Sequence, residues 1–177
     1  MIWPSSFGRE TIRASRRFGA DRLRHTHRGV DLRGPGALVL AWMDGRVKAV
    51  LADTPGPGSV PAAPGAPVSP GTGGVVVVLD HGGGLESRYM HLASVAVSTG
   101  ATVRAGDTIG GVGRSGFRTG STTEDHLHFE ILDRGQHVDP LPLLASAQEG
   151  GATAGLVLAA GLVVIGLLLG WVGWWTV

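Results

Sequence analysis

Histidine and aspartate residues occur in two short motifs whose spacing suits metal binding. In HRGVD, His27 and Asp31 are four residues apart, and in DHLHFEI, His126 and His128 are two apart. Residues i and i+2 of a β-strand face the same side, so the second motif presents two imidazoles together. Catalytic zinc takes three His or carboxylate ligands and leaves a fourth position for water. His27, Asp31 and one imidazole of the HLH pair supply such a set, and the other imidazole is then placed for proton transfer or oxyanion stabilisation.

The composition agrees with a site built from His and carboxylate groups. The 177-residue chain has seven His and no Cys, which excludes disulfides and thiolate metal sites. The motif YMHL adds His91 as a further candidate. His25 is read as an outer support of the first ligand or an exposed residue, His81 as a residue at a strand end, and His137 as a turn residue.

The elements that must position these residues are predicted to be β-strands. With 30 Gly and 10 Pro the chain disfavours a mostly helical fold. A 21-residue stretch, 53–73, holds six Pro and five Gly, which cannot continue a strand ladder; we expect an exposed loop that either shapes a substrate groove or is a solvated insertion. Strands are predicted at 37–42, 46–51, 74–80, 85–91, 108–112 and 126–132.

Charge is distributed unevenly along the chain. Residues 1–48 hold ten Lys and Arg against four acidic residues, whereas residues 49–149 hold five against ten. The basic segment suits either an anionic polymer or lipid headgroup, or an ordinary solvated surface. Because no aromatic or helical periodicity accompanies the arginines, nucleic-acid binding is not predicted.

The last 28 residues carry no charge. Residues 154–175 are almost purely apolar and long enough, at 1.5 Å per residue, to cross a hydrocarbon core of about 30 Å. We therefore predict a linker at 149–153 and one C-terminal transmembrane helix at 154–176, with Trp171, Trp174 and Trp175 near the membrane interface. A buried core helix is the alternative. Glu149 is the only charge near the span and nothing basic follows it, so the positive-inside rule does not orient the span. The first residues show no secretory signal peptide.

Several motifs follow one another in the order seen in one family of enzymes. The sequence resembles the lysostaphin-type zinc endopeptidases over residues 5 to about 144. The motifs that carry the resemblance are SSFGR at 5–9, HRGVDL at 27–32, DGRV at 44–47, GGVVVVLDHGGGLESRYMHL at 73–92, VRAGDTIGGVGRSG at 103–116, HLHFEI at 126–131 and VDP at 138–140.

The resemblance implies a fold and a chemistry. The fold is a mainly β, antiparallel sandwich-like metallopeptidase core over residues 1–148. One Zn2+ per chain is expected to be bound by His27, Asp31 and His128, with His91 and His126 as catalytic histidines. The implied substrate is a peptide of bacterial peptidoglycan, cross-bridge or stem, hydrolysed by a zinc-activated water. Together with the predicted span, this suggests a membrane-anchored enzyme whose peptidase domain faces the cell wall.

Two features depart from the family pattern. Glu124 and Asp125 precede HLHFE, where small residues are usual; pointing inward they would favour a charged His126, and pointing outward they would not. The insertion at 53–73 is longer than the usual connection, which leaves the groove shape open.

Three other functions remain to be separated. A phage lysin or virion-associated peptidase would use the same chemistry. A non-catalytic relative would bind cell wall or activate a partner hydrolase. A biotinyl or lipoyl carrier fits the glycine spacing, but Lys48, the only lysine, lies within a predicted strand rather than at a hairpin tip.

Overall fold

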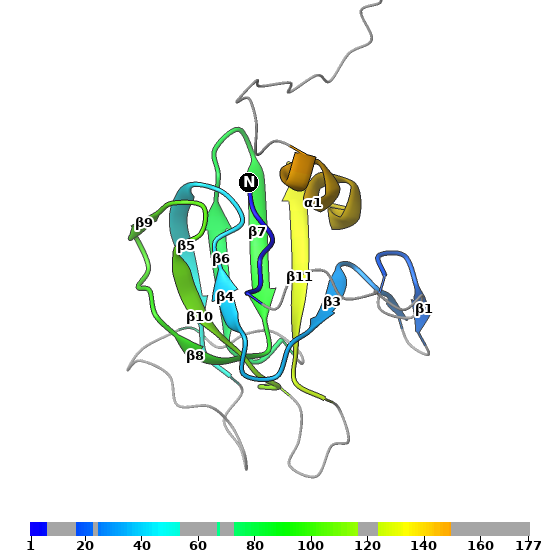
Figure 1. The fold of residues 1–177 in the computed structure, drawn as a ribbon, viewed down its shortest axis with the longest axis horizontal. Coiled ribbons are helices and arrows are strands. Elements are labelled where there is room, and N and C mark those ends of the chain that lie inside the picture. The colour runs from blue at the N-terminus through cyan, green and yellow to red at the C-terminus, as the bar shows by residue number, and fades with distance from the viewer. Residues whose placement is uncertain (7–16, 23–24, 54–66, 68–72, 117–123, 150–177) are drawn as a thin grey trace, which may run out of the picture.

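The computed structural model describes residues 1–6, 17–22, 25–53, 67, 73–116 and 124–149. Within these residues the chain forms strands and a single helix (Figure 1). Neighbouring strands are antiparallel throughout, as predicted for a mainly β core.

A seven-stranded sheet contains most of the predicted strands. Its order is β12-β11-β7-β6-β5-β9, and β3 pairs with the first half of β11 on the edge that β12 occupies farther along. The seven strands are β3 (Val30–Arg33), β5 (Gly45–Leu51), β6 (Val76–Asp80), β7 (Leu85–Met90), β9 (Thr102–Val103), β11 (His126–Asp133) and β12 (Gln136–Val138).

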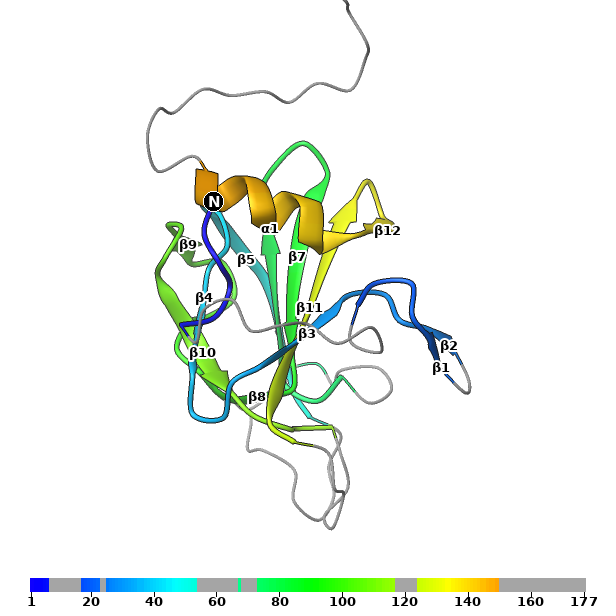
Figure 2. The same cartoon turned by 45° about the vertical axis from the view of Figure 1, so that its right-hand side comes forward.

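A second, three-stranded sheet lies beside the first in both ribbon views (Figures 1 and 2). It has the order β4-β10-β8, with β4 at Leu38–Leu40, β10 at Thr108–Val112 and β8 at Leu92–Val95. A small pair, β1 (Asp21–Arg22) and β2 (His25–Thr26), projects from one side of the molecule (Figure 2).

The hydrophobic core joins the two sheets. Val39, Ile109 and Leu92 from the small sheet belong to the same buried cluster as Val77 and Phe129 from the large sheet. Because alternate residues of a strand face opposite sides, β11 divides its side chains between two environments. Its odd-numbered residues, Leu127, Phe129 and Ile131, join the core, and its even-numbered residues carry the histidines to the other face.

All six predicted strands are present, and no end is shifted by more than two residues. The helix α1 (Pro140–Glu149) was missed by sequence reasoning and lies across one end of the large sheet (Figure 2). Its start has a recognisable signal, because Pro140 occupies the first helical position and Asp139 caps the helix, accepting a hydrogen bond from Leu141 N at 3.0 Å.

Two predicted segments fall wholly or largely outside the described residues. Only residues 53, 67 and 73 of the Pro/Gly-rich stretch are described, and the predicted span at 154–176 is not described at all. In the part of the chain that the structure describes, no helix combines the length and apolar character needed to cross a bilayer. The transmembrane helix therefore stays a prediction.

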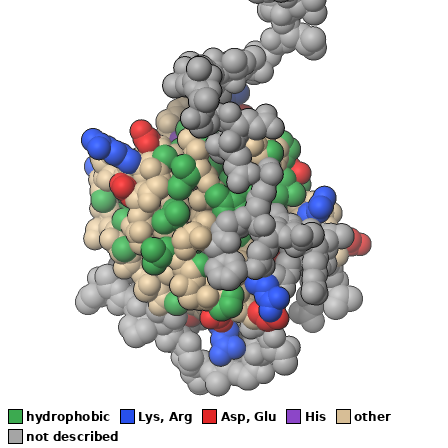
Figure 3. Space-filling view, viewed as in Figure 1, with side chains coloured by type: hydrophobic (Ala, Val, Ile, Leu, Met, Phe, Trp, Pro, Cys, Tyr) green, Lys and Arg blue, Asp and Glu red, His purple; other side chains and the backbone are tan. Residues whose placement is uncertain are grey.

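The surface of the described core is mixed in character. On the face drawn in Figure 3, hydrophobic side chains are interspersed with polar atoms, and the Lys, Arg, Asp and Glu side chains lie toward its edges. Among described residues, the large hydrophobic side chains that are exposed are those of Met1 and Leu38.

Candidate metal site and adjacent histidines

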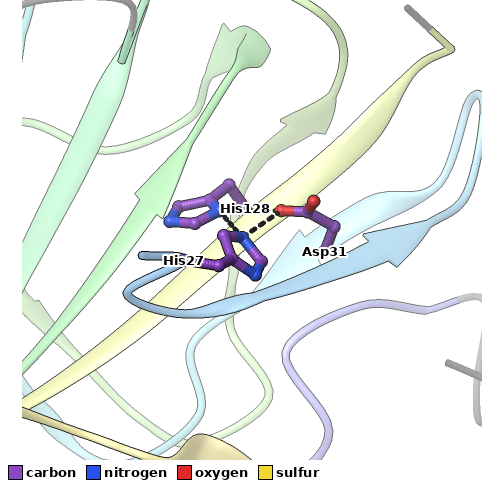
Figure 4. Close-up of side chains that lie close together, drawn as sticks. All are labelled: His27, Asp31 and His128. Carbon is purple, nitrogen blue, oxygen red and sulfur yellow. Dashed lines mark hydrogen bonds and ion pairs between the residues drawn. The ribbon is translucent and has the colours of Figure 1, made fainter. Parts of the chain in front are cut away.

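Three predicted ligands converge on one point, and we call them the ligand cluster: His27, Asp31 and His128 (Figure 4). His27 Nε2 lies 3.0 Å from Asp31 Oδ1 and 3.0 Å from His128 Nδ1, and His128 Nδ1 lies 2.7 Å from Asp31 Oδ1. All three residues are buried. The structure thus brings together residues separated by about a hundred positions in the sequence.

The pairing of β3 with β11 produces this convergence. Asp31 and His128 are directly opposed in the strand register, and His27 lies just before β3. Gly29 allows the close approach of the two segments, because a Cβ there would lie 2.3 Å from the carbonyl oxygen of Phe129. The glycine of HRGVD is therefore required by the contact between these strands.

In both His27 and His128, the ring nitrogen that faces away from the ligand cluster, the outer nitrogen, donates a hydrogen bond. His27 Nδ1 donates to Arg17 O at 2.8 Å, and His128 Nε2 donates to Glu130 Oε1 at 3.1 Å. In a neutral imidazole the other nitrogen then carries a lone pair. The two inner nitrogens and the Asp31 carboxylate oxygen consequently point acceptor atoms at one another, an arrangement that needs a cation between them.

These residues fit a zinc ion by donor chemistry and by spacing. Two neutral imidazoles and one carboxylate are a known catalytic zinc set, and zinc holds such atoms at about 2.0–2.2 Å, which places them slightly more than about 3 Å apart. The observed separations of 2.7 and 3.0 Å are close to that requirement. Hydrogen bonds from the outer nitrogens to Arg17 O and Glu130 Oε1 are the kind that orient metal-binding histidines.

Without a metal ion, the pKa values of Asp31 and His128 determine the charge of the ligand cluster. Burial would raise the pKa of Asp31, but the close contacts of its carboxylate with His128 and His27 outweigh burial and hold that pKa well below its usual range. Burial would lower the pKa of His128, but its hydrogen bonds to Asp31 and Glu130 raise it to about 9. A proton on His128 therefore takes the place of a metal cation at neutral pH.

The other two predicted residues form the histidine pair, His91 and His126, beside the ligand cluster. Their ring centroids are 4.9 Å apart, and the His91 ring is 6.0 Å from that of His128. His126 Nδ1 donates to Glu124 O at 2.8 Å, and His91 Nδ1 donates to Ser115 O at 3.0 Å. Because a carbonyl only accepts, both rings carry a proton on Nδ1, which leaves Nε2 as the basic nitrogen of each neutral ring.

His91 has an unusual backbone. Its φ of 63° lies in the left-handed region, which non-glycine residues rarely adopt and which is found most often where function requires it. Burial, and then repulsion from His126 and His128, lowers the pKa of His91 to about 3. His91 is therefore neutral at neutral pH, with no proton on Nε2.

A tight backbone contact holds His91 in this conformation. Its N donates to Gly73 O at 3.0 Å, next to Gly74, where a Cβ would lie 2.3–2.5 Å from Ser115. Ser115 Oγ in turn accepts from Val75 N at 2.9 Å. Sequence reasoning missed Ser115, since nothing in a lone serine signals that its carbonyl supports a histidine.

The structure also decides expectations left open by the sequence. His128, not His126, is the imidazole of the HLH motif that meets His27 and Asp31; His126 Nε2 lies 4.0 Å from Asp31 Oδ1. The carboxylates before the motif point outward, since exposed Glu124 pairs with Arg33 at 2.6 Å and Asp125 lies 3.8 Å from Arg114.

Three further residues take structural positions. His81 Nδ1 donates to Asp44 O, and its Nε2 makes a hydrogen bond with Ser87 Oγ, away from the ligand cluster. Burial lowers the pKa of His81. His137 lies on β12 rather than in a turn and contacts Glu130. Lys48 lies within β5 and pairs with Glu86, so it is not displayed at a hairpin tip as a carrier lysine would be.

The fold and the His-Asp-His geometry define a metallopeptidase class, and a family comparison agrees. The model of Peptidase family M23 matches residues 25–140, and the chain belongs to this family. The family is zinc-dependent, and the matched range includes every residue of the ligand cluster and the histidine pair.

Of two similar proteins, one is a hydrolase activator and the other a peptidoglycan endopeptidase. The murein hydrolase activator EnvC of Escherichia coli (strain K12) is 45% identical over 71 residues, which are 40% of this chain and 16% of that protein. The peptidoglycan DD-endopeptidase ShyA of Vibrio cholerae is 38% identical over 68 residues, 38% of this chain and 15% of that protein. The chain spans less than a quarter of the length of the curated relatives it matches.

A solved structure extends the likeness over most of the chain. The antimicrobial peptidase lysostaphin from Staphylococcus simulans is similar with a TM-score of 0.54 and 28% sequence identity, covering 81% of this chain and 53% of that chain. The predicted resemblance to lysostaphin-type enzymes is thereby confirmed at the level of family and fold.

Proposed function

We propose that the chain is a zinc-dependent endopeptidase that hydrolyses peptide bonds in bacterial peptidoglycan. The observation that carries the proposal is the convergence of the ligand cluster beside two histidines whose Nδ1 protons are fixed by backbone carbonyls. Family membership and the peptidoglycan DD-endopeptidase relative support the substrate class.

His27 Nε2, Asp31 Oδ1 and His128 Nδ1 would hold the metal. Bound there, zinc would polarise the scissile carbonyl and make hydroxide available near neutral pH. The remaining work falls to the histidine pair. His91 Nε2 or His126 Nε2 accepts a proton during attack, and one of the two histidines, once protonated, stabilises the oxyanion or delivers a proton to the leaving amine.

Hydrolysis of whole peptidoglycan tests the proposal. The full chain, purified in mild detergent, should release peptides from sacculi of either stem-linked or Gly-bridged type, stop with a chelator, and recover with added zinc. Asp31→Asn should remove the activity, whereas Asp133→Asn, an exposed change at the end of the same sheet strand β11, should keep it. Zinc-loaded protein that leaves every wall type intact would contradict the proposal.

An activator role is the second candidate, favoured by the similarity to the murein hydrolase activator. The complete ligand cluster and histidine pair support catalysis instead, because a binding protein needs neither. Protein that binds sacculi without cutting them, and that increases the activity of an added wall hydrolase, would support the activator role.

We further propose that the apolar stretch at 154–176 anchors the chain in a membrane with the peptidase domain facing the wall. The support is its length and lack of charge. Each Lys placed at the centre of such a span costs about 2.5–3.5 kcal/mol. Val163→Lys with Leu167→Lys should therefore move the protein from the membrane fraction to the soluble fraction; continued membrane association would count against the anchor.

A further inference from the structure

Glu130 is a buried carboxylate beside the ligand cluster, and so far only one of its two oxygens has been described. It is 5% exposed and follows His128 by two residues, on the same face of β11. Its Oε1 accepts the hydrogen bond from His128 Nε2 at 3.1 Å. A carboxylate in this position usually fixes the orientation of a metal-binding imidazole.

The second oxygen of Glu130 is held from two neighbouring strands. His137 Nε2, on β12, donates to Glu130 Oε2 at 3.2 Å, and Arg88 Nη1, on β7, lies 3.7 Å from the same oxygen. Arg88 is directly opposite Glu130 in the register of β7 with β11, and His137 is opposite Leu132, the next residue on that face. The sheet therefore delivers both partners to Glu130 from opposite sides.

The two carboxylate oxygens of Glu130 therefore have different partners. A buried carboxylate is costly unless its lone pairs are satisfied, and His137 and Arg88 satisfy Oε2. With Oε2 held, Oε1 has one direction available, which is toward His128 Nε2. The His128 ring is then oriented with Nδ1 toward His27 and Asp31.

We propose that His137, acting through Glu130, is a positioning residue that orients His128 for metal binding. The inference rests on the proposed metal site and adds a residue that lies outside the ligand motifs. His137 itself touches neither the ligand cluster nor the histidine pair through any described contact. It lies on the three-residue strand β12, and its side chain is 22% exposed, so its removal leaves the hydrophobic core in place.

Zinc affinity is the measurement that separates positioning from simple structural support. The full chain in detergent is titrated with zinc against a chromophoric chelator, for wild type, His137→Ala, His137→Gln and Gln136→Ala. His137→Gln offers an amide nitrogen that reaches Glu130, and Gln136→Ala is a control on the same strand with its side chain on the opposite face. Thermal unfolding of each metal-free protein is measured in parallel.

We expect His137→Ala to weaken zinc binding about tenfold, the low end of the range for outer-shell partners of a metal. His137→Gln should recover most of that loss, and Gln136→Ala should bind zinc as wild type does. Glu130→Ala should weaken binding at least as much as His137→Ala, because it removes the group through which His137 acts.

Wild-type zinc affinity in His137→Ala overturns the inference, as does an equal loss in His137→Ala and His137→Gln. The inference is also wrong if zinc affinity falls only in parallel with thermal stability and does so in the Gln136→Ala control as well. The proposed function fails separately. If the wild type binds zinc tightly but leaves peptidoglycan intact, the proposed enzymatic activity is wrong, and the zinc affinities of the variants still test the role of His137. A wild type that binds no zinc rejects both.

Discussion

The side chains of the ligand cluster contact one another, whereas each ring of the histidine pair is held by its own backbone carbonyl. The inner nitrogens of His27 and His128 and the Oδ1 of Asp31 lie 2.7–3.0 Å from one another, so each depends on the others. His91 and His126 instead donate from Nδ1 to Ser115 O and Glu124 O. A change in the ligand cluster should therefore spread through it, while a change beside the histidine pair should affect one ring.

The same difference appears in charge. Without metal, His128 keeps a proton because its carboxylate partners raise its pKa to about 9, whereas burial lowers the pKa of His91 to about 3. The ligand cluster thus favours a positive charge on His128, whereas His91 stays neutral. Variants that damage one region and spare the other test whether this division is real.

Asp31→Asn should have the largest effect. The carboxylate contacts both ligand histidines, and its loss removes the only negative charge in the ligand cluster. Peptidoglycan hydrolysis should fall by at least about 10³-fold, because the zinc-bound water can no longer be generated. Zinc content, measured by elemental mass spectrometry, should fall with the activity. Retained stoichiometric zinc in the variant would mean that Asp31 is not a ligand.

His91→Asn should come next and should spare the metal. Asparagine tolerates the left-handed φ of 63° better than most residues, so the change removes the imidazole with little backbone cost. Loss of a general base or acid lowers kcat by about 10²–10⁴-fold. Kinetics and zinc content measured on one preparation should show this loss at wild-type zinc levels.

Arg134→Asn is the matched control for that change. Arg134 is the other described non-glycine residue with positive φ, at 47°, and lies in the exposed turn between β11 and β12. Its substitution should leave hydrolysis unchanged. A comparable loss in both variants would show that the positive φ, rather than the His91 imidazole, explains the result.

Gly74→Ala should weaken catalysis through the support of His91. The added Cβ would meet Ser115 at 2.3–2.5 Å and displace the carbonyl that holds His91 Nδ1. Misplacement of a catalytic group by about 1 Å costs roughly 10²-fold in rate. Zinc affinity should stay within the wild-type range, since the ligand cluster is not touched.

Gly82→Ala controls for the glycine conformation alone. Gly82 has φ +80°, similar to +66° at Gly74, but its Cβ would meet nothing within 4 Å. Both variants should lose stability by about 1–3 kcal/mol from the backbone strain, measured by thermal unfolding, and only Gly74→Ala should lose activity. Full activity in Gly74→Ala would show that Ser115 does not position His91.

The contrast between the two regions also explains what sequence could predict. The spacings of HRGVD and HLHFE place ligands by local geometry, and period two puts His126 and His128 on one face. The choice of His128 over His126 depends on the register of β3 with β11, a contact across 97 residues. Spacing within either motif carries no information about that register.

Support from the backbone was harder to foresee. The contact of Gly74 with Ser115 joins segments 41 positions apart through atoms that every residue has. Glu130 could have been found, because it continues the i, i+2 series of His126 and His128. The role of His137 could not, since it depends on how the short strand β12 pairs with β11.

The smallest predicted effect is a dependence of zinc affinity on pH that comes from the ligand cluster alone. Zinc must displace the proton that His128 holds in the metal-free protein below its pKa of about 9. Affinity should therefore rise about tenfold per pH unit as pH increases toward 9 and then level off, one proton being released for each zinc bound. Asp31 stays ionised through this range, because its pKa is lowered, and His91 stays neutral, so neither adds to the slope. Calorimetric titration in buffers of different ionisation enthalpy counts the released protons. His91→Asn should release the same number of protons as wild type. Glu130→Gln removes one cause of the raised His128 pKa, so it should move the plateau of zinc affinity to lower pH. If the pH dependence of zinc affinity changes in His91→Asn and not in Glu130→Gln, the two regions titrate together.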